Sequence, residues 1–201
     1  MTEDTPYALV RQAKEQDRPT VSGVLIEAFM NDPVASWLFP DAAERGRLQS
    51  LFYGQLLDSG EADLLGRGEG AAVWLSLAAG QVLEEDAPDP VFGENGARLA
   101  NLGQALAERH PRREPHLYLS CMGVANARQG AGLGSLLLRH GLARADADGL
   151  AVYLEASSPR SRALYLRHGF TDLGEPVRVA DSPPLWPMTR PNHHSQQGES
   201  R

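Results

Sequence analysis

A glycine-rich segment between a predicted strand and a predicted helix could bind an anion. It runs from Ala125 to Gly134 and includes Gly130 and Gly132. Glycines let a backbone approach a ligand closely, and the free N–H groups at a helix start favour phosphate oxygens. A turn without a ligand can use the same residues, so the interpretation depends on the rest of the chain.

Two known phosphate motifs can be compared with this segment directly. A Walker loop needs a Lys-Ser or Lys-Thr pair after its last glycine, whereas Gly134 is followed by Ser135 and Leu136, which excludes it. The dinucleotide pattern G-x-G-x-x-G would begin at Gly130, but its third glycine position is Ser135. Glu155 could imitate the ribose-binding acid of that motif, so a dinucleotide site stays an alternative.

A third pattern extends over two separate parts of the chain. Gln129, Gly132 and Gly134 form Gln-x-x-Gly-x-Gly after a strand, and Tyr165 begins a later Y-x-x-x-GF that ends at Phe170. Together these motifs resemble the GNAT superfamily of acetyltransferases, as does the opening segment from Arg11 to Asp17. The resemblance implies an α/β fold with a mixed, mostly antiparallel central sheet flanked by helices and splayed between the fourth and fifth strands.

The resemblance also implies a cosubstrate, acetyl-CoA, and no metal. It predicts that the backbone of one strand contacts the pantetheine arm, that the glycine-rich segment holds the pyrophosphate, and that Ser158 replaces an asparagine that helps to orient the cofactor. The predicted cofactor-binding residues are Met122, Gly123, Val124, Gln129, Gly130, Ala131, Gly132, Leu133, Gly134, Ser135 and Ser158. The N–H of Val124 is a further candidate, as the donor to the developing oxyanion.

Two residues are predicted to be catalytic. Tyr165 would protonate the departing thiolate, a role implied by its motif and suited to a phenol with a pKa of about 10. Glu155, at a strand end, would take a proton from the acceptor ammonium. The alternatives are a buried core tyrosine and a structural carboxylate. Cys121 is expected to be a small buried hydrophobe, which predicts direct transfer without an acyl-enzyme.

The acceptor is predicted to be a primary amine of a small molecule. Several further segments are similar to puromycin N-acetyltransferases, among them 28–33, 110–115, 154–157 and 186–190, which implies an antibiotic-like or other specialised metabolite as the acceptor. A domain of this fold could instead be a non-catalytic acetyl-CoA-binding sensor or partner module.

Aromatic and acidic residues near the N-terminal helices have two interpretations. Aromatic side chains could wall an apolar acceptor pocket or simply form core; they are Phe29, Trp37, Phe39 and Tyr53. Three acids could attract a cation or cap helices, namely Glu27, Asp32 and Asp41.

Hydrophobic periodicity and the Gly and Pro positions predict the elements that must position these residues. Strands are expected at 7–12, 62–65, 71–77, 116–124, 150–156, 177–180 and 185–189, and helices at 19–30, after Asp41, 96–109, 134–145 and 159–168. A loop is expected at 37–40.

Composition limits the class of protein. The 201 residues carry a formal net charge of −7, which argues against a nucleic-acid surface, and the single Cys121 cannot form an internal disulfide. We expect one domain over residues 1–190 and a disordered tail over 191–201. The acidic N-terminus and the lack of a long apolar run predict a cytoplasmic protein that does not enter a membrane. We expect it to be a monomer or a homodimer.

Overall fold

The computed structural model describes residues 9–81 and 89–192. Their seven-stranded sheet has the order β1-β2-β3-β4-β5-β7-β6, and each neighbouring pair is antiparallel except β4 and β5. The strands are β1 (Val10–Gln12), β2 (Glu61–Leu65), β3 (Gly70–Leu77), β4 (His116–Val124), β5 (Ala151–Ala156), β6 (Thr171–Asp172) and β7 (Trp186–Arg190). The predicted α/β fold with a mostly antiparallel sheet is confirmed.

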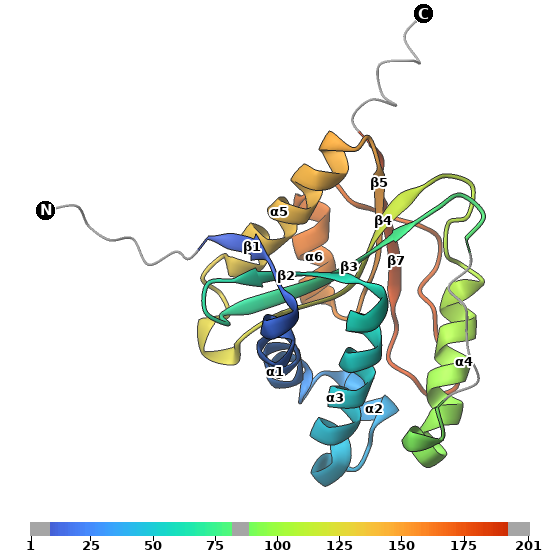
Figure 1. Cartoon of the computed structure of the whole chain (residues 1–201). Coiled ribbons are helices and arrows are strands. Elements are labelled where there is room, and N and C mark those ends of the chain that lie inside the picture. Colours follow the sequence, from blue (N-terminus) through green and yellow to red (C-terminus); the bar gives the residue numbers. More distant parts are fainter. Residues whose placement is uncertain (1–8, 82–88, 193–201) are drawn as a thin grey trace, which may run out of the picture.

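Helices cover both faces of this sheet (Figure 1). On one face α5 and α6 share a buried cluster with Trp74, Leu119 and Leu154; on the other, α1 and α3 pack on Leu64 and Val73. The α-helices are α1 (Arg18–Phe29), α2 (Pro33–Leu38), α3 (Ala42–Ser59), α4 (Gly96–Ala107), α5 (Leu133–Ala147) and α6 (Pro159–Arg167), with short 3-10 turns η1 (Glu15–Asp17), η2 (Pro90–Asn95) and η3 (Asn126–Arg128).

The sheet opens between its two parallel strands. Pairing of β4 with β5 runs from His116–Ala151 to Leu119–Leu154, whereas β4 continues to Val124. A register shift on the other side of β4 pairs Trp74 with Leu119 and Val73 with Cys121, which leaves Ser120 as the extra residue of a bulge. The predicted splay between the fourth and fifth strands is therefore confirmed.

Two local predictions were wrong. Residues 37–40 were expected to be a loop, but Trp37 and Leu38 end helix α2, which begins at Pro33 with Asp32 as its cap. The proline that ends α1 also starts α2, because a proline suits the first turn of a helix.

The strand expected at 177–180 does not form. Val177 makes one isolated bridge with Leu185, and the chain then turns at Ala180, whose φ is 50°. Pro183 and Pro184 lack the N–H groups that a continuing ladder would need. The two-residue strand β6 was not anticipated. Of the expected tail, residues 193–201 lie outside the described residues, as do residues 7 and 8 of the first expected strand.

Candidate functional site

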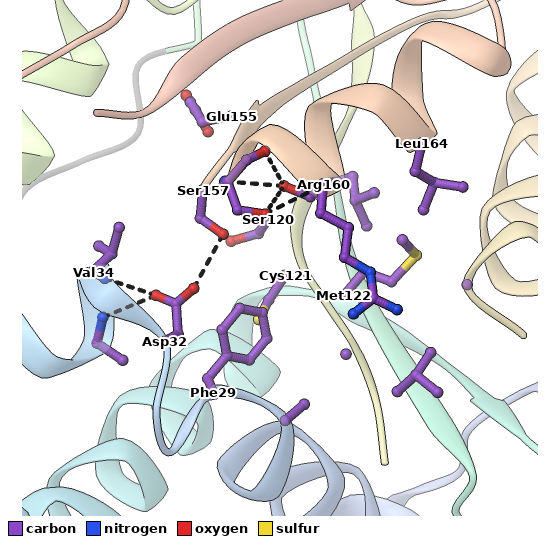
Figure 2. A pocket seen from close by; sticks show the side chains of 18 of the residues that line it. Phe29, Asp32, Val34, Ser120, Cys121, Met122, Glu155, Ser157, Arg160 and Leu164 are labelled. Carbon is purple, nitrogen blue, oxygen red and sulfur yellow. Dashed lines mark hydrogen bonds between the residues drawn. The ribbon is translucent and has the colours of Figure 1, made fainter. Parts of the chain in front are cut away.

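A cavity of about 820 Å³ opens where β4 and β5 separate. Figure 2 shows the side chains that line it, contributed by β4, β5, α6 and the junction of α1 with α2. Twelve of the predicted site residues line this one cavity: Met122, Gly123, Val124, Gln129, Gly130, Gly132, Leu133, Gly134, Ser135, Glu155, Ser158 and Tyr165. The remaining one, Ala131, is an exposed residue of the same loop that does not line it.

The backbone of β4 presents polar groups to the opening. The N–H of Ala125 donates to the Glu69 carbonyl at 3.0 Å, which fixes the alternation of hydrogen-bonded pairs between β3 and β4. Because successive residues of an antiparallel strand point their backbone groups to opposite sides, those of Met122 and Val124 point away from β3. The strand that would pair with them, β5, has already diverged.

The glycine-rich loop folds into the start of α5. Gly130 and Gly132 have φ of 86° and 80°, a left-handed conformation that glycine adopts without strain, and Gly132 is the N-cap of α5. At this helix start the Ser135 N–H donates to the Gly132 carbonyl at 3.0 Å, whereas no backbone group of the described residues accepts from the N–H groups of Leu133 and Gly134. These two residues line the cavity, so their N–H groups are ready for an acceptor.

Side chains brace this loop from both ends. The Gln129 Nε2 donates to the Val124 carbonyl at 3.2 Å and to Asn126 Oδ1 at 3.1 Å, and Arg160 of α6 donates to Gln129 Oε1 at 3.4 Å. The Ser135 hydroxyl lies 3.0 Å from His168 Nε2. The loop is therefore held in shape before any ligand binds.

The two carboxyl oxygens of Glu155 have different surroundings. The Tyr118 hydroxyl donates to Glu155 Oε2 at 2.8 Å, whereas Oε1 is buried and has no partner among the described residues. Burial raises the pKa of Glu155 to about 7, although the hydroxyls of Tyr118 and Tyr153 act to lower it. Glu155 therefore changes charge near neutral pH.

Tyr165, on α6, lines the same cavity as Glu155. Its ring packs on Phe170 with centroids 5.7 Å apart, and in the described part of the chain no group bonds to its hydroxyl. Burial, and secondarily the Cys121 thiol, raise the pKa of Tyr165 above its usual value. The side chain is thus a neutral phenol at physiological pH.

Cys121 and Ser158 also have defined environments. Burial raises the pKa of Cys121 to about 12, so this side chain stays a thiol at neutral pH. Ser158 caps α6 by accepting from the Ser161 N–H at 3.1 Å. The hydroxyl that replaces the expected asparagine is therefore engaged in holding the start of α6.

Sequence reasoning missed some residues of the cavity. Tyr118, the partner of Glu155, and Arg160, which contacts Gln129, were not singled out. Tyr118 follows His116 by two residues along β4, so their side chains share one face of the sheet. This spacing predicts the shared face but does not predict which side chain Tyr118 contacts. Of the aromatics considered, Phe29, Phe39 and Tyr53 line the cavity, whereas Trp37 packs under Arg98 outside it.

Comparison with known proteins identifies the family. Residues 64–170 match the acetyltransferase (GNAT) family, and a Corynebacterium glutamicum structure, described as histone acetyltransferase HPA2 and related acetyltransferase, is 34% identical. That similarity covers 92% of this chain and 97% of the other, with a TM-score of 0.67. The chain belongs to the GNAT acetyltransferase family.

Other GNAT structures share the fold at low identity. Arylalkylamine N-acetyltransferase 2 from Aedes aegypti is 13% identical over 91% of this chain and 98% of that chain, with a TM-score of 0.66. The ribosomal-protein-S18-alanine N-acetyltransferase from Escherichia coli is 18% identical over 91% and 92%, with a TM-score of 0.55.

Family membership makes this GNAT protein an N-acetyltransferase, and the acyl donor of the family is acetyl-CoA. Membership of this family replaces the dinucleotide-binding alternative. In residues 9–81 and 89–192 no three His, Cys, Asp or Glu side chains gather to hold a metal ion. Each helix in those ranges is too short or too polar to cross a bilayer.

Proposed function

We propose that this enzyme transfers the acetyl group of acetyl-CoA directly to a primary amine of a small molecule, including antibiotic-like metabolites. The observation that carries the proposal is the placement of a candidate acid and a candidate base, from two different elements, in the lining of one cavity. Tyr165 comes from α6 and Glu155 from β5, and the glycine-rich loop and the open edge of β4 line the same space.

Acetyl-CoA would bind along β4 and the loop. The start of α5 and the N–H groups from Gly130 to Gly134 receive the pyrophosphate, with Arg128 and Arg160 adding positive charge. The outward backbone groups of Met122 and the Val124 carbonyl bond to the amides of the pantetheine arm, as an added strand would. This geometry brings the thioester to the gap between β4 and β5.

The chemistry is a displacement at the thioester carbonyl. Glu155 takes one proton from the acceptor ammonium, and the neutral nitrogen attacks the carbonyl carbon to form the C–N bond. The Val124 N–H stabilises the oxyanion of the tetrahedral intermediate. Its collapse breaks the C–S bond, Tyr165 gives its proton to the thiolate, and the phenolate is reprotonated by the proton that the nitrogen loses.

The pKa values of Glu155 and Cys121 support this route. A base works best when its pKa lies near the working pH, and that of Glu155 is about 7. A covalent route through Cys121 would need a thiolate, whereas its pKa of about 12 keeps it protonated. Transfer therefore proceeds in one ternary complex.

Release of free thiol from acetyl-CoA tests the proposal. The purified protein would be incubated with acetyl-CoA and puromycin, aminoglycosides, polyamines or amino acids. We expect acceptor-dependent release, and in Tyr165→Phe a loss of about 100-fold in kcat with unchanged acetyl-CoA affinity by calorimetry. Binding of acetyl-CoA without release of free thiol in the presence of any of these amines would instead identify a sensor.

A further inference from the structure

Charged side chains are segregated along the cavity. Its lining contains three arginines, Arg128, Arg160 and Arg167, which all belong to the glycine-rich loop or to α6. Its two acids, Asp32 and Glu155, belong to the junction of α1 with α2 and to β5. The end that receives the phosphates is therefore cationic, and the other end is acidic.

The walls of the acidic end are apolar. They come from α1, α2, α3, α4 and the segment before β7, and include Phe29, Leu38, Phe39, Phe52, Leu106 and Leu185. Among the described residues that line the cavity, no lysine or arginine lies on these elements. A pocket of this kind binds an apolar body and fixes its orientation with a few polar groups.

One carboxylate oxygen of Asp32 accepts hydrogen bonds from the backbone, and the other faces the pocket. Its Oδ1 accepts from the N–H groups of Val34 and Ala35 at 2.8 and 3.1 Å, which holds the start of α2. Within the described ranges its Oδ2 accepts a single long hydrogen bond, from the Ser157 hydroxyl at 3.4 Å. Figure 2 shows Asp32 directed at Ser157, with Phe29 beside it.

The end of β5 lies next to both acids: Glu155 belongs to this strand, and Asp32 contacts the residue that follows Glu155 by two positions. Ser157, the neighbour of Asp32, follows Glu155 by two residues at the point where β5 ends. A cation near this point would lie between two carboxyl groups, whereas a carboxylate would be repelled by both. Their placement favours a cationic acceptor and disfavours an anionic one.

We propose that the acceptor is a primary amine on an aromatic or similarly large apolar body without a carboxylate, and that Asp32 recognises its positive charge. This assignment rests on the proposed function and names its substrate class. Glu155 remains the base, and Asp32 determines specificity. The pocket disfavours free amino acids because of their carboxylate, and polyamines and aminoglycosides because they lack an apolar body.

Matched acceptors test the substrate class. Phenylalaninamide and phenylalanine share one aromatic body and one amine and differ in the carboxylate; phenethylamine and ethylamine differ only in the apolar body. We expect kcat/KM to be about 100-fold higher for phenylalaninamide than for phenylalanine, and about 10-fold higher for phenethylamine than for ethylamine.

Asp32→Asn separates the charge of Asp32 from its capping role, because asparagine keeps an oxygen for the Val34 and Ala35 N–H groups. We expect the KM for phenylalaninamide to rise about 10-fold and the preference over phenylalanine to shrink, with the acetyl-CoA KM and the Tm unchanged. Asp41→Asn is the matched control. Asp41 caps α3 by accepting from the Ala43 N–H at 2.9 Å and does not line the cavity, so neither KM should change.

Three results would overturn the assignment. Equal kcat/KM values for phenylalanine and phenylalaninamide would show that the acidic residues do not select against a carboxylate. Equal kcat/KM values for ethylamine and phenethylamine would show that the apolar walls do not select for an apolar body. If Asp32→Asn behaves as Asp41→Asn does, Asp32 has no role in recognition. In each case acetyl transfer would still stand, whereas failure of every amine in the series would overturn the proposed function together with this assignment.

Discussion

At the scale of single residues, the proposed base Glu155 should give the enzyme its pH dependence. A base must be ionised to accept a proton, and the pKa of Glu155 is about 7, so kcat/KM should rise as the pH increases through neutrality. Glu155→Gln should lower the rate by about 100-fold and abolish this rise. Initial rates of both proteins between about pH 5.5 and 9 measure this pH profile. An unchanged profile in the variant would exclude Glu155 as the base.

Tyr118 should tune that same titration. Its hydroxyl donates to Glu155 Oε2 at 2.8 Å and acts to lower the pKa of the carboxyl group. Tyr118→Phe removes the bond, so the pKa of Glu155 should rise further and the rise in rate should move to higher pH. A Tyr118→Phe profile that moves to lower pH, or not at all, would contradict this coupling.

The proposed catalytic residues were easier to find in the sequence than their partners. Tyr165 and Gln129 belong to sequence motifs, and Glu155 could be placed at a strand end from local pattern alone. The bond between Tyr118 and Glu155 joins two strands distant in sequence, and only their register, with Tyr118 beside Tyr153, brings it about. Asp32 was recognised as a possible cap or cation site, but its orientation towards Ser157 depends on tertiary packing.

At the scale of elements, the left-handed turn before α5 should matter for cofactor binding. Gly132→Ala forces an alanine into a φ of 80°, at a cost of about 1 kcal/mol. Gly174→Ala is the matched control, since its φ is 79° and, as at Gly132, nothing lies within 4 Å of an added Cβ. We expect similar losses of stability by urea unfolding, but a roughly 10-fold higher acetyl-CoA KM only for Gly132→Ala. Equal KM values would contradict a cofactor role for this turn.

The close packing of α5 on the sheet predicts a second element-scale effect. A Cβ on Gly141 would lie 2.0 Å from a ring atom of Trp74, which is fully buried. Gly141→Ala should therefore lower the free energy of unfolding by about 1–3 kcal/mol. Gly23→Ala, at an exposed position of α1 with open space around it, should instead raise the free energy of unfolding by about 0.5–1 kcal/mol. Chemical denaturation measures both, and the same sign for both would contradict the packing argument.

Most elements could be predicted because their hydrophobic periods are strong and their ends carry Gly or Pro. The errors at α2 and at 177–180 have local causes. Asp32 and Pro33 can either end a helix or begin one, and α2 forms because Val34, Leu38 and Phe39 find a shared buried cluster with Leu48. Val177 and Val179 favour a strand by propensity, but past Val177 no neighbouring strand is available to pair with.

At the scale of the whole molecule, a buried histidine should make stability depend on pH. His110 is 7% exposed, and burial, with His116 and Arg112, lowers its pKa from 6.5 to about 4. Between these values the unfolded chain binds a proton that the folded chain does not, so stability is full above about pH 6.5 and falls as the pH drops towards 4.

His110→Phe keeps a ring against Tyr118 and Tyr153 and removes the titrating group. Urea unfolding at several values between pH 7.5 and 5 should therefore show a shallower loss of stability in the variant than in the wild type. Equal slopes would show that His110 contributes nothing to the acid sensitivity of the fold.

Mass spectrometry of one reaction tests the central claim most directly. Acetyl-CoA labelled in its acetyl group would be mixed with phenethylamine and the enzyme, and the amine, the free CoA and the intact protein would be measured together. Direct transfer predicts labelled N-acetyl amine and free CoA in equal amounts, with the protein mass unchanged. Label retained on the protein, or CoA released without acetylated amine, would contradict it.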